Sequence, residues 1–151
     1  MYAGDFTWDK ESQAFYMRHK LSNGQFCLIA FVRYFASRAT KYYVVFAVAN
    51  KKKNLNGYFN ETKDNNITLK MTGRCGLEAL YWCRDRLLEF EQSVRLDKTN
   101  DTVIVVAGED SKRFRMYAKA LARYGYKKVL TEDGWTVQKS LGLNNGGYQN
   151  D

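Results

Sequence analysis

The segment SKRFRMYAKALARYGYKKVL, residues 111–130, changes from a helical to a strand pattern within a few residues. Its apolar residues recur at the spacing of one helix face: Phe114, Tyr117, Ala118, Leu121 and Ala122. Gly125 follows them, and glycine is favoured in the left-handed conformation just past a helix end. The segment therefore predicts a helix over Ser111–Tyr124, a glycine stop and an immediate strand over Tyr126–Leu130.

Regular elements are also predicted on both sides of this segment. Thr102–Ala107 reads TVIVVA and predicts a buried strand, while Trp135–Leu141 predicts a hairpin partner for the strand 126–130. Residues 108–111 include Asp and Ser, whose oxygens cap helix N-termini. A long buried helix is predicted over Leu77–Gln92 from residues spaced three and four apart: Leu77, Leu80, Tyr81, Leu87 and Leu88. Trp82, Cys83 and Phe90 widen its apolar stripe.

The first half of the chain predicts strands rather than helices. Aromatic and β-branched runs predict a meander of three strands: Phe15–Leu21, Phe26–Phe35 and Tyr42–Ala49. Asn23-Gly24 predicts the tight turn between the first two, because this pair supplies positive φ angles. Residues 36–41 are expected to be a polar connector, 50–66 a long loop, Ile67–Met71 a short fourth strand, and 1–13 a loosely docked start.

These elements predict an α+β (mixed α/β) fold, with a mixed sheet of about seven strands and two main helices. A chain of 151 residues with 45% hydrophobic residues suits one domain, expected over 1–141 and followed by a disordered tail over 142–151. No apolar run reaches the roughly 18 residues that span a bilayer. The first residues, MYAGDFTWDKESQ, do not resemble a signal peptide, so a cytoplasmic location without membrane contact is expected.

Charge and cysteine content restrict the partners. The net charge of +8 favours an anionic partner, such as nucleic acid, a phosphate-bearing cofactor or an acidic protein surface. Cys27, Cys75 and Cys83 form no C-x-x-C pair, and His19 is the sole histidine, so a zinc site is poorly supported. We expect each cysteine to be a reduced, small buried hydrophobe.

Two glycines precede the long helix in LKMTGRCGLEAL, residues 69–80. Backbone amides at a helix N-terminus lack partners and carry partial positive charge, so phosphates bind there. Gly73 and Gly76 would let a pyrophosphate approach the main chain, and Arg74 could add a bidentate contact. Most such turns are only turns, however, and Cys75 is either an activated thiol or a small filler.

The second half of the chain resembles the GNAT superfamily of N-acetyltransferases. The resemblance covers Ile67–Leu141 through the ordered segments ITLKM, TGRCG, LEALYWCRDRLLEF, TVIVVA, DSKRFRMYAKALARYGY and WTVQKSL. In that family two neighbouring strands splay apart, the pantetheine arm pairs with the exposed strand backbone, and a turn before a long helix holds the pyrophosphate. The form is similar to compact acetyltransferase-like proteins of tailed bacteriophages, which implies a GNAT-like sheet short of the usual N-terminal helices and a location in the host cytoplasm.

The resemblance implies acetyl-CoA as cofactor and transfer of an acetyl group to an amine of a protein or small molecule. It places the cofactor contacts on these residues: Leu69, Lys70, Met71, Thr72, Gly73, Arg74, Cys75, Gly76 and Ser111. Direct attack of an amine on the thioester needs a base and a general acid. Tyr117 and Tyr124 are the candidates for the acid. His19, Glu78 and Glu109 are candidate bases, although roles on a solvated strand, on a helix surface and in a cap suffice for them.

The sequence departs from the family pattern at two site positions. Cys75 stands where the second small glycine belongs, and Leu121 stands where the general-acid tyrosine is frequent. Tyr117 shares a helix face with Phe114 and Leu121, so core packing is its competing role. The alternative to an enzyme is therefore a catalytically inactive protein of the same fold that binds a host or defence protein, or nucleic acid, through a basic face.

Cations and aromatic residues alternate between residues 111 and 128. The cations are Lys112, Arg113, Arg115, Lys119, Arg123, Lys127 and Lys128. Such a mixture suits phosphate backbones and stacked bases. A basic, solvent-exposed helix face accounts for much of the same pattern, so both interpretations stay open here.

Overall fold

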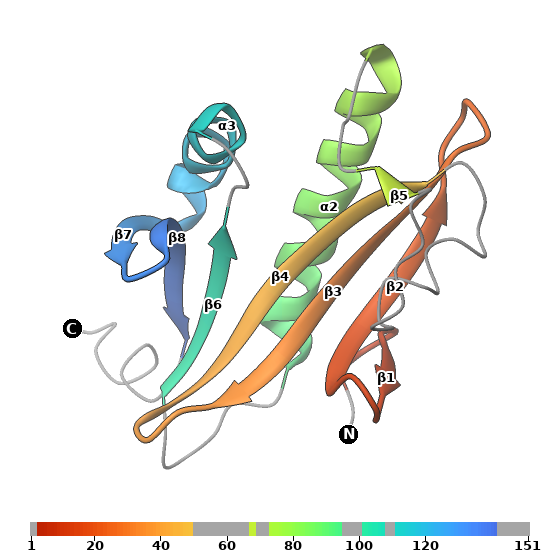
Figure 1. Cartoon of the computed structure of the whole chain (residues 1–151). Helices are drawn as coiled ribbons and strands as arrows, with labels where there is room; N and C mark the ends of the chain where they lie inside the picture. Colours follow the sequence, from red (N-terminus) through yellow and green to blue (C-terminus); the bar gives the residue numbers. More distant parts are fainter. Residues whose placement is uncertain (1–2, 50–66, 69–72, 95–100, 108–110, 142–151) are drawn as a thin grey trace. The chain divides into compact units, whose positions relative to one another are not determined.

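The computed structural model of the chain describes residues 3–49, 67–68, 73–94, 101–107 and 111–141 (Figure 1). The strands are β1 (Thr7–Asp9), β2 (Ala14–Lys20), β3 (Phe26–Phe35), β4 (Ala39–Ala49), β5 (Ile67–Thr68), β6 (Asp101–Ala107), β7 (Lys127–Thr131) and β8 (Gly134–Leu141). The helices are α2 (Gly73–Ser93), α3 (Ser111–Leu121) and the short 3-10 helix η2 (Ala122–Tyr124). The predicted loop 50–66, the cap residues 108–110 and the tail 142–151 lie outside the described residues.

The strands form one mixed sheet, which confirms the predicted α+β fold class. Seven of them follow one another in the hydrogen-bonded order β1-β2-β3-β4-β6-β8-β7, and β5 pairs with the end of β4. The β4–β6 pair is parallel, while β1–β2, β4–β5, β6–β8 and β7–β8 are antiparallel. A parallel pair between strands far apart in the chain requires a crossover connection, and the crossover here contains α2.

The chain divides into two compact units. Unit 1 consists of residues 1–31 and 45–94, and unit 2 consists of residues 32–44 and 95–151. β3 and β4 contribute residues to both units, because the division falls within each strand. The units are described separately below.

Unit 1 has an aromatic core between α2 and the strands. Phe31 of β3 stacks face to face on Phe90 of α2, with 3.9 Å between ring centroids and 2° between planes. Phe6 meets both rings edge-on at 5.5 Å, and Phe15 lies 5.7 Å from Phe90. All four side chains are buried, so together they anchor the helix on the sheet.

The N-terminal residues of unit 1 correct the prediction of a loosely docked start. Ala3 and Phe6 are buried, and β1 pairs with β2 from Thr7–Tyr16 to Asp9–Ala14. The predicted turn is confirmed, since Gly24 has a φ of +91°. This segment is docked because Phe6 supplies the edge-on ring that completes the aromatic core.

The buried face of α2 agrees with the prediction only in part. Leu77 and Tyr81 were expected to face the core, yet both are exposed, whereas Cys83, Leu87 and Phe90 are buried as expected. The buried residues follow a neighbouring line along the helix: Ala79, Cys83, Leu87, Phe90 and Val94. This line has the small side chains Ala79 and Cys83 at its start and the larger Leu87, Phe90 and Val94 toward its end.

Unit 2 is built on β6, which lies between β4 and β8. Its ladder with β4 runs from Ala39–Asp101 to Val44–Val106, and its ladder with β8 runs from Thr102–Leu141 to Ala107–Thr136. The prediction of residues 36–41 as a connector is therefore wrong beyond Arg38, because Ala39, Thr40 and Lys41 belong to β4 and pair with β6. The β7–β8 hairpin is confirmed.

The end of α3 confirms the predicted glycine stop. Gly125 has a φ of +94°, and its amide donates to the carbonyl of Ala122. The last turn is a 3-10 helix rather than an α-helix, so Ala122 is exposed instead of facing the core. β7 then begins at Lys127, two residues past the glycine.

Candidate functional site at the start of helix α2

The predicted glycine turn is itself the first turn of α2. The helix begins at Gly73, so Gly73, Arg74, Cys75 and Gly76 are helical rather than part of a preceding turn. In an α-helix each amide donates to the carbonyl four residues earlier. For Gly73, Arg74 and Cys75 that carbonyl precedes the helix, so these three amides have no intrahelical acceptor. No acidic residue occupies this turn. The positive end of the helix dipole is therefore not offset by a carboxylate of its own first turn.

The second turn of α2 is fixed against the end of β4. Ala79 is buried in a cluster with Val48 of β4 and with Leu21 and Cys27 of the β2–β3 region. Phe46 and Trp82 pack on the edge of this cluster. Because Ala79 lies three residues beyond Gly76, the cluster positions the first turn of α2 near the end of β4.

β4 extends beyond its parallel partner at this end. The ladder with β6 ends at Val44–Val106, while β4 continues to Ala49 and pairs with β5 only at Val48 and Ala49. In the described part of the chain, neither the β6 nor the β5 ladder includes residues 45–47. The strand beside β6 is thus β4 and not the segment Ile67–Met71, which was predicted to be a short fourth strand. Only Ile67–Thr68 of that segment is described as a strand.

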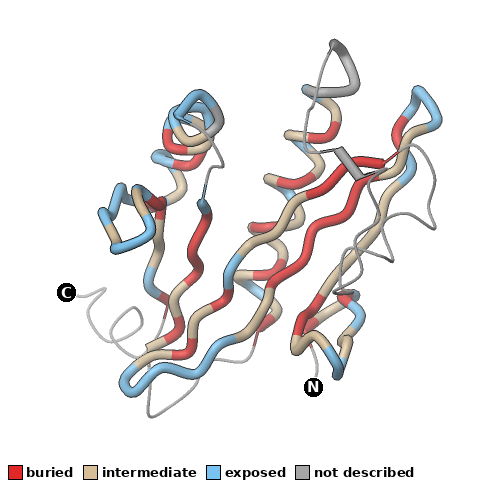
Figure 2. The backbone as a smooth tube through the Cα atoms, viewed as in Figure 1, coloured by how far each residue is buried: buried red, intermediate tan, exposed pale blue. Residues whose placement is uncertain are grey.

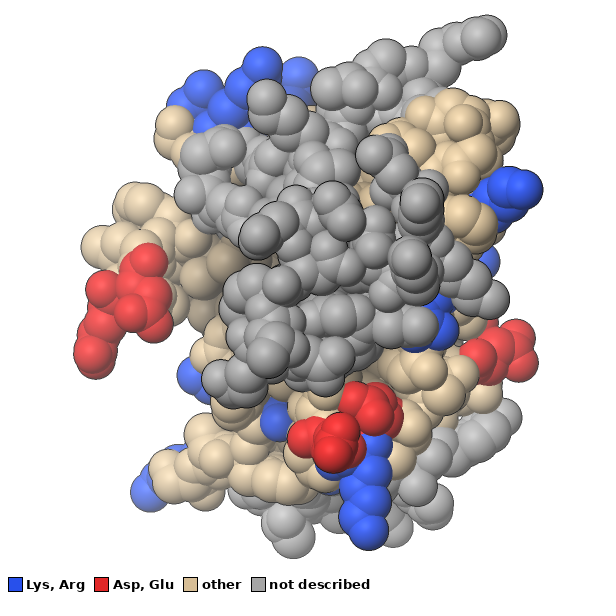
Figure 3. Space-filling model, turned by 45° about the vertical axis from the view of Figure 1, so that its right-hand side comes forward, with Lys and Arg blue, Asp and Glu red and all other residues tan. Residues whose placement is uncertain are grey.

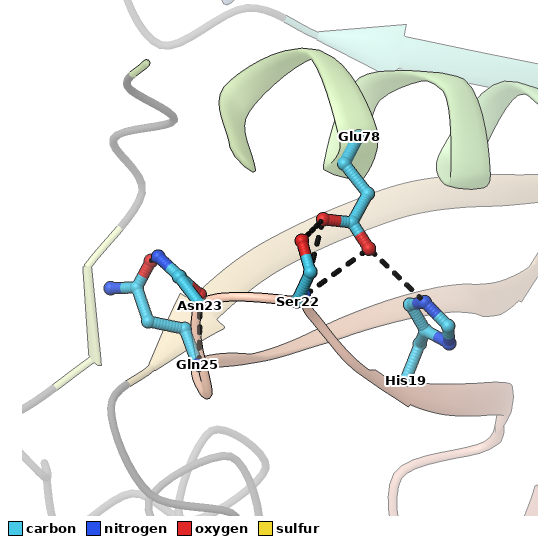
Figure 4. A network of polar contacts seen from close by, with 5 residues as sticks. All are labelled: His19, Ser22, Asn23, Gln25 and Glu78. Atoms are coloured by element: carbon cyan, nitrogen blue, oxygen red, sulfur yellow. Dashed lines mark hydrogen bonds and ion pairs between the residues drawn. The ribbon is translucent and has the colours of Figure 1, made fainter. Parts of the chain in front are cut away.

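A polar network connects α2 to the turn after β2 (Figure 4). The Ser22 hydroxyl donates to Glu78 Oε1 at 2.6 Å, and the Ser22 amide donates to both carboxylate oxygens at 3.2 and 3.3 Å. His19 Nε2 lies 3.9 Å from Glu78 Oε2. The structure therefore brings two of the three candidate bases together, and it adds Ser22, which the sequence analysis did not single out.

This network is a structural clamp rather than a nucleophilic triad. In a serine triad the hydroxyl bonds to an imidazole nitrogen, whereas Ser22 bonds directly to the carboxylate. The His19 ring stacks on Trp82, with centroids 5.1 Å apart and planes 13° apart. His19 is thus packed against α2, and Glu78 holds the Ser22 turn.

Two of the three thiols are chemically protected. Burial, with a smaller contribution from the charge of Glu78, raises the pKa of Cys27 to about 12. Burial also raises the pKa of Cys83 well above its ordinary value, and neither cysteine is in a disulfide. Both are therefore the small buried hydrophobes that the sequence predicts. The side chain of Cys75 lies outside the described part of the structure.

The other predicted site residues fall into two groups. Leu69, Lys70, Met71 and Thr72 lie outside the described residues, as does Glu109. Ser111, Tyr117 and Tyr124 belong to unit 2 and not to the unit that contains the start of α2. Ser111 is the exposed first residue of α3, and both tyrosines are half-buried, with Arg123 over the ring of Tyr124.

Cations line one side of α3 and η2. Their side chains are exposed and spaced three or four residues apart: Lys112, Arg115, Lys119 and Arg123. From Ser111 to Thr131 the sequence contains no acidic residue. Figure 3 shows one face of the molecule, on which Lys and Arg gather at the upper left and Asp and Glu occur lower down. This basic stripe is the strongest local concentration of one charge sign among the described helices.

Comparisons with other proteins do not identify a relative. No protein-family model, no curated protein and no solved structure matches this chain. Neither α2 nor α3 carries an apolar stretch that could cross a bilayer. Among the described residues, no three His, Cys, Asp or Glu side chains gather in a way that could hold a metal ion.

Proposed function

We propose that the protein is an acetyl-CoA-dependent N-acyltransferase of GNAT-like fold, acting on an amine of a protein or small molecule. The observation that carries the proposal is the start of α2. It combines two glycines, first-turn amides that lack helix acceptors and the absence of acidic residues, and it is held near the end of β4. The order of elements agrees with the resemblance of the sequence, since a long helix, a parallel strand, a shorter helix ending on glycine and a hairpin follow in turn.

The charge at the start of α2 and the small size of its glycines support pyrophosphate binding there. Three backbone amides can donate to phosphate oxygens, and glycine at positions 73 and 76 adds no side chain in the path. The first acidic residue of the helix is Glu78, and its oxygens already accept hydrogen bonds from Ser22. We propose that Gly73, Arg74 and Cys75 hold the pyrophosphate through their amides.

β4 offers the second proposed contact. Residues 45–47 lie beyond the β6 ladder, so their backbone groups on that edge can pair with the amide-bearing pantetheine arm. When bound, acetyl-CoA supplies a thioester carbon that an amine can attack. The chain itself would bind and orient the two substrates and move protons, with Tyr117 and Tyr124 as the candidate general acids.

A pair of variants at Gly73 tests this proposal. Gly73→Glu places a carboxylate beside the proposed pyrophosphate, whereas Gly73→Gln adds nearly the same volume without the charge. We expect Gly73→Glu to weaken acetyl-CoA binding at least ten-fold more than Gly73→Gln in isothermal titration calorimetry. The same carboxylate should raise the melting temperature, because an acidic residue near a helix N-terminus stabilises the helix by about 0.3–1 kcal/mol.

A higher melting temperature together with weaker acetyl-CoA binding in Gly73→Glu would show that the binding site is lost while the fold is kept. Arg74→Ala removes the guanidinium that could add a bidentate contact to the pyrophosphate, so it is expected to weaken binding as well. Arg84→Ala, farther along α2, should not. The absence of heat and of any thermal shift with millimolar acetyl-CoA would refute the proposal. Tyr117→Phe and Tyr124→Phe keep the rings in place, so a fall in kcat without a fall in melting temperature would identify the general acid.

The basic stripe on α3 supports a second candidate function, nucleic-acid binding without catalysis. Three exposed cations on one side of α3, continued by Arg123 of η2, can contact successive phosphates of a backbone. The test is the salt dependence of binding to duplex DNA, measured for the parent and for a Lys112→Ser, Arg115→Ser, Lys119→Ser variant. Each lost phosphate contact should reduce the slope of log K against log salt by about 0.9. Lys10→Ser with Lys20→Ser removes exposed cations from unit 1 and serves as the control.

A further inference from the structure

The end of the β3–β4 hairpin exposes large aromatic side chains. Phe35 is 70% exposed and Tyr34 is 56% exposed. Figure 2 shows this turn as a continuous pale-blue stretch, and residues 34–38 are all exposed. Tyr43, which contacts Tyr34, is 37% exposed as well. Contiguous exposed aromatic surface marks an interaction site more often than isolated exposed apolar residues do.

The exposed rings are held in place by their neighbours. Successive residues of a strand point to opposite faces, so Tyr34 and Phe35 present their rings on opposite sides of the hairpin. Tyr34 packs edge-on against Tyr43 of β4, with 5.1 Å between centroids and 87° between planes. The guanidinium of Arg33 lies 4.7 Å from the centroid of the Phe35 ring. Each side of the hairpin end therefore offers an aromatic ring supported by a partner.

All charged side chains at the end of the β3–β4 hairpin are cationic. Residues 32–44 contain Arg33, Arg38 and Lys41 and no acidic residue. The carboxylate nearest in the ladder is that of Asp101, which is in register with Ala39 and whose amide donates to the carbonyl of Arg38. The hairpin end thus combines cations with exposed rings, and this combination is complementary to a ligand that carries both anionic groups and planar faces.

We infer that the end of the β3–β4 hairpin binds single-stranded nucleic acid. Unpaired bases would stack on Tyr34 and Phe35, and phosphates would approach Arg38 and Lys41. A duplex keeps its bases stacked on one another, so it offers these rings no base face and should bind less well. An acidic peptide would use the cations but would not need the rings. The inference is independent of both proposed functions, because none of its residues belongs to α2 or α3.

Fluorescence anisotropy with labelled oligothymidylate and oligouridylate tests the inference on the full chain. The variant Tyr34→Ala, Phe35→Ala should bind both oligonucleotides at least ten-fold more weakly, with the salt dependence unchanged. The variant Arg38→Ser, Lys41→Ser should instead reduce the slope against log salt by roughly 0.7 per lost contact. Leu130→Ala removes a side chain of unit 2 that is 62% exposed, and it should leave affinity unchanged.

The conservative variant Tyr34→Phe, Phe35→Tyr keeps both rings and should retain affinity, which separates stacking from a loss of fold. Melting temperatures of all variants should stay close to that of the parent. Selective binding of the DNA or of the RNA oligonucleotide would support the inference and identify the preferred sugar. Equal binding by the alanine variant, preference for a duplex of the same length, tighter binding of polyglutamate, or no binding by the parent would each overturn it.

Discussion

One aromatic cluster in each compact unit shows a contrast in exposure. In unit 1, Phe6, Phe31 and Phe90 are buried against one another between α2 and the strands. In unit 2, Tyr34 and Phe35 are exposed at the hairpin end, beside cations. Aromatic side chains therefore build the core of unit 1, whereas at the hairpin end of unit 2 they face solvent. The elements packed around each ring decide whether it is buried or exposed.

Charge follows the same division. Unit 1 contains eleven Lys and Arg against nine Asp and Glu, whereas unit 2 contains thirteen against seven. Unit 2 is the shorter of the two, so its excess of positive charge is also more concentrated. The basic character of this protein therefore belongs mainly to unit 2, in which Tyr34 and Phe35 are exposed.

Phe90→Ala should have the largest effect on stability. Removing a buried phenylalanine that contacts three other aromatic rings is expected to cost about 3–5 kcal/mol of unfolding free energy. Phe35→Ala, at an exposed site of unit 2, should stay within about 0.5 kcal/mol of the parent. Urea unfolding followed by circular dichroism measures both, and similar losses for the two variants would remove the contrast between the units.

Alkaline pH should destabilise unit 1 through its buried thiols. Folding raises the pKa of Cys27 from its ordinary value of 9.0 to about 12, so the folded state holds this proton more tightly than the unfolded chain does. The contribution of the protonated Cys27 thiol to the free energy of unfolding is complete below pH 9.0. It is lost as pH rises toward about 12, by up to about 1.4 kcal/mol per pH unit.

The free energy of unfolding should fall less steeply with rising pH in Cys27→Ala than in the parent, and this difference isolates the thiol from other titrating groups. All three cysteines belong to unit 1, so no thiol of unit 2 contributes to this pH dependence. Native labelling with a thiol reagent should modify no more than one of the three cysteines, and labelling in denaturant should modify all of them. Fast labelling of Cys27 or Cys83 in the native protein would contradict their burial.

Ser22→Ala should have an intermediate effect. It removes the 2.6 Å hydrogen bond to Glu78, which is expected to cost about 1 kcal/mol because the network is partly exposed. A double-mutant cycle with Glu78→Gln should give a coupling energy of similar size. Additive losses in the two single variants would show that the clamp does not hold the start of α2.

Asp101→Asn should have the smallest effect, and it concerns unit 2 alone. It removes the carboxylate beside the hairpin end without changing the size of the side chain. Single-stranded oligonucleotides should then bind about two-fold more tightly at low salt, with the difference fading as salt screens the charge. Weaker binding after this substitution would show that Asp101 contributes a contact of its own.

The sequence predicts local elements well where the pattern and the environment agree. The strand Phe26–Phe35 and the stop at Gly125 follow directly from β-branched and aromatic content and from the left-handed preference of glycine. The face of α2 was predictable only in part. Cys83, Leu87 and Phe90 were expected in the core and are buried, but Leu77 and Tyr81 fit the same spacing and are exposed, while the small Ala79 is buried in their place.

The candidate site was predictable only in part. The glycines before Leu77 indicated a helix start, but their low helix propensity favoured a turn, and packing of Ala79 against Val48 extends the helix over them. The contact between Ser22 and Glu78 joins residues 56 positions apart, which no local pattern encodes. Tyr34 and Phe35 end a strand that was predicted correctly, but sequence alone does not show where a sheet face lacks a cover.

The parallel β4–β6 ladder has a consequence for synthesis of the chain. All residues of unit 1 have been made once Val94 is complete, whereas the β4 residues Ala39–Val44 must wait for Asp101–Val106. Until then, a growing chain on the ribosome displays an unsatisfied strand edge beside Tyr43, and such edges invite pairing with neighbouring polypeptides. Chaperone demand during translation should therefore be greatest in the interval before β6 emerges.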